Sequence, residues 1–168
     1  MRRLISFVGN ICSGKSTISN IVAKTLAIEV FSIDEFRKKH QAFLINGEWA
    51  AWDDLKQSIS GKEIAILESS GLSQNVRDIY SFFDETIIVL IDCPSNILIK
   101  RIAEREASNY EPVPFCYARK TESVEKRVAD FGKLLSAIKP NFIFNSHEMD
   151  VEEISKRVIE IINNSLQN

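Results

Sequence analysis

Short, continuous apolar segments alternate along the chain with segments in which apolar residues recur every three or four positions. A short apolar run predicts a buried β-strand, whereas spacings of three and four place apolar side chains on one face of a helix. The apolar runs predict five strands, at residues 4–8, 30–33, 63–67, 86–91 and 141–144. The helical spacing is clearest from about residue 15 to 26 and along the final stripe of Val151, Ile154, Val158, Ile161 and Ile162.

Further helices are predicted between the remaining strands: one from about Asp34, one carrying Trp49, Trp52 and Leu55, one containing Val76, Ile79 and Phe83, one after Pro94, and one along Val124 to Ile138. Residues 106–117 contain two prolines and little periodicity, which predicts a loop. Five strands that alternate with helices predict an α/β fold of three layers with a five-stranded parallel sheet. In such folds ligands bind at the carboxyl edge of the strands.

The size and composition of the chain are typical of one globular domain. Its 168 residues are 45% hydrophobic and 26% charged, so we expect a single domain over residues 1–168. The net charge is -2, which argues against a nucleic-acid partner because such proteins usually carry an excess of Lys and Arg. A local basic groove stays open as an alternative, and the oligomeric state is not predicted.

Cysteine usage and the length of the apolar runs bear on the compartment. Cys12, Cys93 and Cys116 are widely spaced and odd in number, so neither a disulfide framework nor a CxxC metal site is expected. No segment approaches the roughly 20 apolar residues that a membrane span needs. The apolar run after Met1-Arg2-Arg3 is too short for a secretion signal. We therefore expect a cytoplasmic protein without a membrane partner.

Residues 9–16 fill every specified position of the phosphate-loop motif GxxxxGK(S/T), which we call the phosphate loop. Its glycines let the backbone wrap closely around phosphate oxygens and present its N–H groups to them. Lys15 is expected at the β and γ phosphates, the Ser16 hydroxyl at Mg²⁺ and the Thr17 hydroxyl at the α-phosphate. The predicted nucleotide-binding residues are Gly9, Asn10, Ile11, Cys12, Ser13, Gly14, Lys15, Ser16 and Thr17.

On this motif and the order of its elements, the chain resembles the P-loop kinases of the adenylate, shikimate, gluconate and adenylylsulfate kinase type over nearly its whole length. The resemblance implies a five-stranded parallel sheet and the use of ATP with Mg²⁺. It also implies an acceptor pocket after the second strand and a basic lid after the fourth, at about residues 101–119.

Asp34-Glu35-Phe36-Arg37 lies just past the second predicted strand, where such kinases place an Asp and an Arg that hold the acceptor. A hydroxyl acceptor loses a proton as it attacks, so Asp34 is the expected catalytic base, while Arg37 would bind an anionic substituent. Together with Ser32, these residues also match the SxDxxR pattern of 5′-hydroxyl polynucleotide kinases. The alternative is that Asp34 caps a helix and Arg37 lies on its solvated face.

Glu68 follows the third predicted strand and resembles the acidic residue that orders a Mg²⁺-bound water in many P-loop proteins. It is therefore expected, with Ser16, at the metal. A carboxylate at this position also has two other uses: it caps the next helix, or it pairs with Lys15 when no nucleotide is bound. Gly71, shortly after, is a candidate acceptor-binding residue, and a plain turn is the alternative.

Three arginines resemble the lid arginines of these kinases. Arg101 and Arg105 are four residues apart and so share one helix face, and Arg119 follows the proline-bearing segment. Arg101 and Arg105 are predicted to act in catalysis by neutralising charge on the transferring phosphoryl group, with Arg119 at the acceptor. The alternative is that they face solvent and pair with Glu104 or Glu106.

These observations favour a kinase that moves the γ-phosphate of Mg-ATP to a small-molecule or nucleotide acceptor. One alternative is a 5′-hydroxyl polynucleotide kinase, supported by the SxDxxR match and opposed by the balanced charge. Another is a nucleotide-binding regulatory ATPase that transfers phosphate only to water, although no switch segment is evident.

Overall fold

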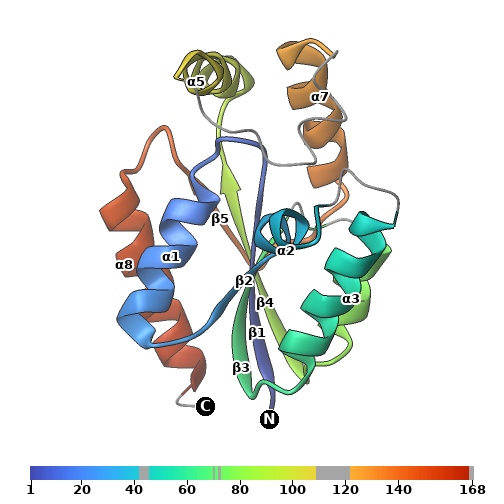
Figure 1. Cartoon of the computed structure of the whole chain (residues 1–168). Helices are drawn as coiled ribbons and strands as arrows, with labels where there is room; N and C mark the ends of the chain where they lie inside the picture. Colours follow the sequence, from blue (N-terminus) through green and yellow to red (C-terminus); the bar gives the residue numbers. More distant parts are fainter. Residues whose placement is uncertain (42–45, 70, 72, 109–121, 167–168) are drawn as a thin grey trace.

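Five parallel strands form one sheet in the order β2-β3-β1-β4-β5 (Figure 1). The structure, a computed structural model, describes residues 1–41, 46–69, 71, 73–108 and 122–166. Its strands are β1 (Arg3–Gly9), β2 (Val30–Ser32), β3 (Ile64–Ser69), β4 (Glu85–Asp92) and β5 (Phe142–Asn145). The five-stranded parallel sheet predicted from the apolar runs is confirmed.

The pairing register brings the carboxyl ends of the central strands to one edge of the sheet. β1 lies between β3 and β4, with Val8 opposite Ser69 and Gly9 opposite Ile91. β2 extends the sheet beyond β3, with Ser32 opposite Glu68. As a result, the phosphate loop after β1 and the SxDxxR segment after β2 both begin at this carboxyl edge.

Helices cover both faces of the sheet and its carboxyl edge. In Figure 1, α1 (Lys15–Leu26) and α8 (Val151–Leu166) lie together on one face. On the other face lie α2 (Ile33–Lys39), α3 (Gly47–Ser60) and α4 (Gln74–Tyr80). The helices α5 (Ser95–Ala107) and α7 (Val124–Leu135) stand over the carboxyl edge. None of the described helices is both long and apolar enough to cross a membrane.

The apolar alternation within β1 divides the core between the two faces. Ile5 and Phe7 join the cluster that α1 and α8 cover, whereas Leu4 joins the cluster that α3 and α4 cover. Successive side chains of a strand point to opposite faces, so a strand buried on both faces reads as a continuous apolar run. A third, smaller cluster joins α5 and α7 and packs against the phosphate loop. It includes Cys93, Leu98, Ile102 and Val128.

Several predicted boundaries are off by a few residues. Ile33, predicted to end the second strand, begins α2, and β3 continues past Glu68 to Ser69. Phe83 lies beyond the end of α4, where it packs on the same core cluster as that helix. The helix predicted to reach Ile138 ends at Leu135. Apolar periodicity reports which side chains are buried, and buried residues continue past the last turn of a helix.

The predicted loop at residues 106–117 is wrong at its start, because Glu106 and Ala107 belong to α5. The rest of that segment from residue 109 on, and with it most of the second half of the predicted lid, lies outside the described residues.

Replacing Leu55 with alanine is expected to lower the free energy of unfolding by about 2–5 kcal/mol. Leu55 is fully buried on α3 in the core cluster that α3 and α4 cover, so truncation removes apolar contacts and leaves a cavity. Urea unfolding followed by circular dichroism measures the change. Leu166→Ala is the control, because Leu166 is 42% exposed. Equal losses in the two variants would contradict this description of the core.

Candidate functional site

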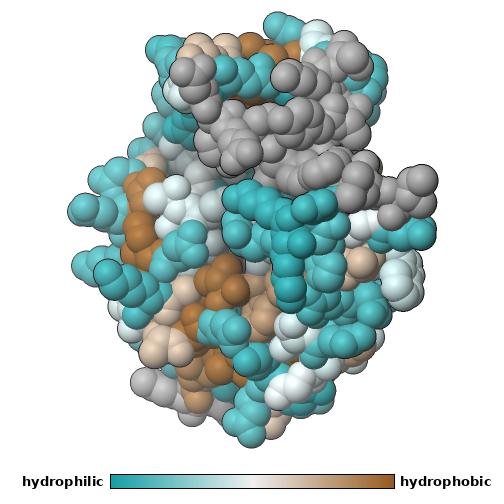
Figure 2. Space-filling model, viewed as in Figure 1, coloured by the Kyte–Doolittle hydropathy of each residue, from teal (hydrophilic) through white to brown (hydrophobic). Residues whose placement is uncertain are grey.

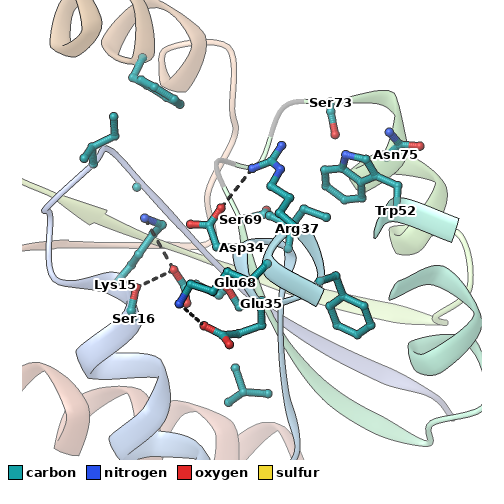
Figure 3. Close-up of a pocket in the computed structure, with 18 of the residues that line it drawn as sticks. Lys15, Ser16, Asp34, Glu35, Arg37, Trp52, Glu68, Ser69, Ser73 and Asn75 are labelled. Atoms are coloured by element: carbon teal, nitrogen blue, oxygen red, sulfur yellow. Dashed lines mark hydrogen bonds and ion pairs between the residues drawn. The ribbon is translucent and has the colours of Figure 1, made fainter. Parts of the chain in front are cut away.

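A pocket of about 1410 Å³ lies at the carboxyl edge of the sheet. The phosphate loop lines one end, and α2, the start of α3 and the segment before α4 line the other. Figure 3 shows Lys15 and Ser16 at the first end, Trp52, Ser73 and Asn75 at the second, and Asp34 and Arg37 between them. The pocket thus has two halves of different chemistry along the sheet edge. One is formed by the phosphate loop, and the other, the acceptor half, by α2, the start of α3 and the residues around the start of α4.

The backbone of the phosphate loop requires glycine at two positions. Gly14 adopts a φ of 94°, in the left-handed region that L-residues avoid. At Gly9, a Cβ atom would lie 2.6 Å from both the Ile91 carbonyl oxygen and Ser13 Oγ. The loop therefore passes close against β4 before it turns into α1. Cys12 also adopts a positive φ, of 59°, which adds to the tight curvature.

The turn from this loop into α1 leaves backbone donors at the pocket. The Ile18 N–H donates to the Gly14 carbonyl oxygen, so the N–H groups of Lys15, Ser16 and Thr17 precede the first hydrogen bond of the helix. Such amides, together with the helix dipole, form an anion-binding site. Ser16 and Thr17 are exposed and line the pocket. These features fit a nucleotide's phosphates.

Side-chain hydrogen bonds of Asn10, within the phosphate loop, and of Arg101, outside it, tie the loop to neighbouring helices. Asn10 is buried and donates from Nδ2 to the Val128 carbonyl oxygen of α7, 3.1 Å away, while its Oδ1 accepts from the Ile11 N–H. Arg101 of α5 donates from Nη1 to the Cys12 carbonyl oxygen at 3.3 Å and also binds Ser146. The helices over the carboxyl edge therefore fix the conformation of the loop.

Lys15, Ser16 and Glu68 converge at the first end of the pocket (Figure 3). The Ser16 hydroxyl donates to Glu68 Oε1 at 2.7 Å, and Lys15 Nζ lies 3.7 Å from the same oxygen. The pairing of Glu68 with Lys15 is thus the arrangement that the structure contains. It also brings together the two groups predicted to serve a metal, since one oxygen of Glu68 contacts the Ser16 hydroxyl.

A hydroxyl and a carboxylate fit Mg²⁺, which prefers oxygen ligands and binds proteins through few of them. Over the described ranges, no three His, Cys, Asp or Glu side chains gather as a metal cluster. Mg²⁺ in kinase sites usually takes its remaining ligands from water and substrate phosphates. The donor set at Ser16 and Glu68 is therefore suited to a metal that arrives with a nucleotide.

A network around the buried Arg37, at the middle of the pocket, joins α2 to α3. Arg37 donates from Nη1 to Asp34 Oδ1 at 3.1 Å, from Nη2 to Glu48 Oε1 at 2.6 Å and from Nε to Glu48 Oε2 at 2.9 Å. The Trp52 indole N–H also donates to Glu48 Oε1, at 2.9 Å, and the Arg37 guanidinium lies over the Trp52 ring. Arg37 is therefore not on a solvated helix face, in contrast to the alternative prediction.

The opposite charges of Arg37 and Glu48 keep both groups ionised although burial favours their neutral forms. Burial would lower the pKa of Arg37, but the hydrogen bond and charge of Glu48, followed by those of Asp34, outweigh it and raise the pKa. Burial likewise would raise the pKa of Glu48, but Arg37, with a smaller contribution from Trp52, lowers it. Both groups are therefore charged at neutral pH. Figure 2 shows hydrophilic residues gathered over α2 beside this network.

Of the remaining predicted site residues, some line the pocket and others contact neighbouring parts of the fold. Arg105 lines it, with Nη1 3.6 Å from Cys12 Sγ, and so shares a helix face with Arg101. Arg101 itself is directed to the loop carbonyl and to Ser146. The Gly71 N–H donates to Ser69 Oγ, and a Cβ there would meet Val8 Cγ1 at 2.5 Å. Arg119 lies outside the described residues.

Glu48 is the principal site residue that sequence reasoning missed. Its position one residue after the Asn46-Gly47 turn and before Trp49 gave the only signal, and nothing in the spacing linked it to Arg37, eleven residues earlier. Ser69, Ser73 and Asn75 also line the pocket and were not singled out. Ser69 ends β3, Ser73 lies in the connection to α4 and Asn75 in the first turn of α4, and the register places the end of β3 beside the phosphate loop.

Comparisons with known proteins agree with this geometry. No model of a known protein family matches the chain. Over 110 residues it is 26% identical to shikimate kinase from Aquifex aeolicus (strain VF5), a match of 58% of this chain and 64% of that protein. The matched segment therefore spans less than two thirds of the length of this relative.

Solved structures share the fold over almost the whole chain. A shikimate kinase from Acinetobacter baumannii in complex with shikimate covers 98% of this chain and is itself covered to 95%, with a TM-score of 0.69 and 15% identity. A sugar kinase from a Janibacter species covers 97% of this chain and is itself covered to 95%, with a TM-score of 0.67 and 18% identity. At these identities the likeness establishes the fold and leaves the substrate open.

These findings confirm the resemblance read from the sequence. The three-layer α/β fold is that of the shikimate kinase and sugar kinase structures, and the chain is similar in sequence to a shikimate kinase. A gluconokinase structure from Sinorhizobium meliloti 1021 shares the fold as well, with a TM-score of 0.61 and 14% identity.

Replacing Glu48 with glutamine is expected to lower the free energy of unfolding by about 1 kcal/mol at pH 7. The estimate is modest because the Glu48 side chain is 47% exposed, so solvent screens the pair with Arg37. A carboxylate whose native pKa is lowered stabilises the fold above its ordinary pKa of 4.5, and this contribution is lost as the pH falls through the native value.

Urea unfolding of the wild type and the variant between pH 7 and pH 3 tests this expectation, and the two curves should converge at low pH. Glu153→Gln is the matched control, because Glu153 also binds an arginine, Arg157, but on the exposed surface of α8. It should change the unfolding free energy by less than about 0.5 kcal/mol. A Glu48→Gln difference that does not depend on pH would contradict the assigned ion pair.

Proposed function

We propose that this protein is a kinase that transfers the γ-phosphoryl group of Mg-ATP to a hydroxyl group of a small molecule. The observation that carries the proposal is a single pocket whose two halves have complementary chemistry. An anion-binding loop forms one half, and a carboxylate on α2, Asp34, lines the other. The sequence similarity to a shikimate kinase supports the same reaction class.

The phosphate-loop half is proposed to bind the triphosphate. The N–H groups at the start of α1 and the Lys15 ammonium are the donors suited to its oxygens, and Ser16 and Glu68 would hold Mg²⁺. When bound, the metal supplies neutralisation of charge on the phosphates. Because Lys15 and Ser16 both contact Glu68, nucleotide binding is expected to exchange the Lys15–Glu68 pair for contacts of Lys15 with phosphate.

Asp34 is proposed as the catalytic base. The acceptor oxygen forms a bond to the γ-phosphorus, the bond from that phosphorus to the β,γ-bridging oxygen breaks, ADP leaves with the electron pair, and the hydroxyl proton passes to Asp34. The hydrogen bond from Arg37 Nη1 holds the Asp34 carboxylate in place, with one of its oxygens engaged. The other oxygen is the one suited to receive the proton.

The two α5 arginines are proposed to have different roles. Arg105 lines the pocket and is positioned to neutralise charge on the phosphates. Arg101 holds the loop through the Cys12 carbonyl oxygen, so its contribution to catalysis is proposed to be the positioning of the loop backbone. Roles for Gly71 and Arg119 at the acceptor stay predictions, and in the structure Gly71 packs closely against Val8.

The alternatives fit the site less well. In the polynucleotide reading Arg37 binds a phosphate of the acceptor strand, but here two carboxylates already take its donors. A regulatory ATPase that transfers phosphate to water needs no pocket for an acceptor molecule. Here α2, α3 and the β3–α4 connection provide such a pocket beside the phosphate loop. A small-molecule hydroxyl is therefore the acceptor that we propose.

Lys15→Ala is expected to reduce phosphoryl transfer to less than about a hundredth of the wild-type rate, because the triphosphate loses its charged side-chain donor. Transfer is measured with γ-labelled ATP, Mg²⁺ and a panel of hydroxyl compounds. Lys24→Ala, an exposed lysine of the same helix, is the control and should leave transfer unchanged. Undiminished transfer by Lys15→Ala would remove the phosphate loop from the reaction.

Asp34→Asn is expected to lower kcat by about 10²–10⁴-fold, since the amide accepts a hydrogen bond but does not take up the proton. Steady-state kinetics on the best acceptor measure the change, with Asp53→Asn as control because Asp53 lies on α3 and binds Gln57. A change in KM alone would assign Asp34 to binding, and wild-type kinetics would show that it has no part in the reaction.

A further inference from the structure

The Arg37 guanidinium is already occupied by carboxylates of its own chain. Its three nitrogens each donate to an oxygen of Asp34 or Glu48, at distances between 2.6 and 3.2 Å. The Arg37 side chain is only 11% exposed, and the Trp52 ring covers one of its faces. An incoming anion would compete with Glu48 and Asp34 for this arginine.

The charges around Arg37 disfavour such an anion. In this network one positive group, Arg37, faces two negative groups, Asp34 and Glu48. The other charges of α2 are paired as well, since Lys38 Nζ lies 3.1 Å from Glu35 and Lys39 Nζ lies 2.7 Å from Asp54 of α3. Over the described residues the acceptor half is therefore neutral to negative, and an anion placed next to the partly exposed carboxylates of Asp34 and Glu48 is repelled by a like charge.

As far as the structure describes them, the other walls of the acceptor half are uncharged and suit a ring that carries hydroxyl groups. Trp49 is 72% exposed although it is a large aromatic residue, and it lines the pocket together with Trp52. Ser73 and Asn75 line the side beyond Trp52, as Figure 3 shows. Aromatic faces pack on the apolar face of a sugar or on a base, while hydroxyl and amide groups bind its polar edge.

We propose that Glu48 is a specificity-determining residue that restricts the acceptor to hydroxyl-bearing ring compounds without negative charge, such as sugars or nucleosides. The proposal rests on the kinase function proposed above and concerns its acceptor half. Glu48 acts by holding Arg37, so that the arginine positions Asp34 and does not bind an acceptor anion. Rejection of anions through an unfavourable charge is a means of specificity in its own right.

The test compares related acceptors of which one is uncharged and the other carries an anionic group. The pairs are shikimate methyl ester with shikimate, methyl glucoside with methyl glucuronide, and adenosine with adenosine 3′-monophosphate. Transfer from γ-labelled ATP gives kcat and KM for each member. In every pair that accepts phosphate, the wild type should use the uncharged member with a kcat/KM at least about tenfold higher. The sugar and nucleoside pairs distinguish the two kinds of ring.

Glu48→Gln should reduce this preference about tenfold, mainly by lowering KM for the charged member, because the amide keeps a similar shape but removes one of the two negative charges next to Arg37. Glu153→Gln removes a carboxylate–arginine pair outside the pocket and should keep the wild-type preference. The wild-type comparison involves no variant, so a folding defect in Glu48→Gln would not affect it.

Preference of the wild type for the charged members, with transfer intact, would overturn the specificity proposal and leave the kinase function standing. An unchanged preference in folded Glu48→Gln would also overturn the role of Glu48. Label that appears only as free phosphate, whatever compound is present, would instead contradict the kinase function and the inference built on it.

Discussion

The site depends on a tight backbone turn at the carboxyl end of the central strand. The phosphate loop must bring several N–H groups to one place, which the left-handed Gly14 and the close approach of Gly9 to Ile91 permit. Asn10 and Arg101 then fix the loop to α7 and α5. Because the donors are held before a ligand arrives, little ordering is needed when phosphate binds.

The same sheet edge carries a second group of charged residues, around Arg37, which does not favour an anion. Around the phosphate loop, Lys15 and the start of α1 favour an anion, whereas around Arg37 two carboxylates compensate the arginine. A buried arginine is stable only when its donors are satisfied, and here Glu48 and Asp34 satisfy them. The pocket thus combines an anion-binding half with a half that holds a carboxylate next to the acceptor.

The fold was predictable from the sequence because the central strands are buried on both faces and therefore read as apolar runs. The phosphate loop was predictable because backbone geometry dictates its glycines. Asp34 and Arg37 were found from their place after β2, yet the Glu48 contact was not, since it depends on how α3 packs against α2. Likewise, Arg101 has the spacing of a lid arginine, but only the tertiary structure shows its bond to Cys12.

A crystal structure with Mg²⁺ and a non-hydrolysable ATP analogue tests the central claim most directly. We predict that the triphosphate lies against the backbone of residues 9–16, with Lys15 Nζ moved from Glu68 to a phosphate oxygen and the Arg37–Glu48 pair unchanged. A triphosphate bound elsewhere on the protein, or a Lys15–Glu68 pair that persists beside a bound nucleotide, would contradict the account.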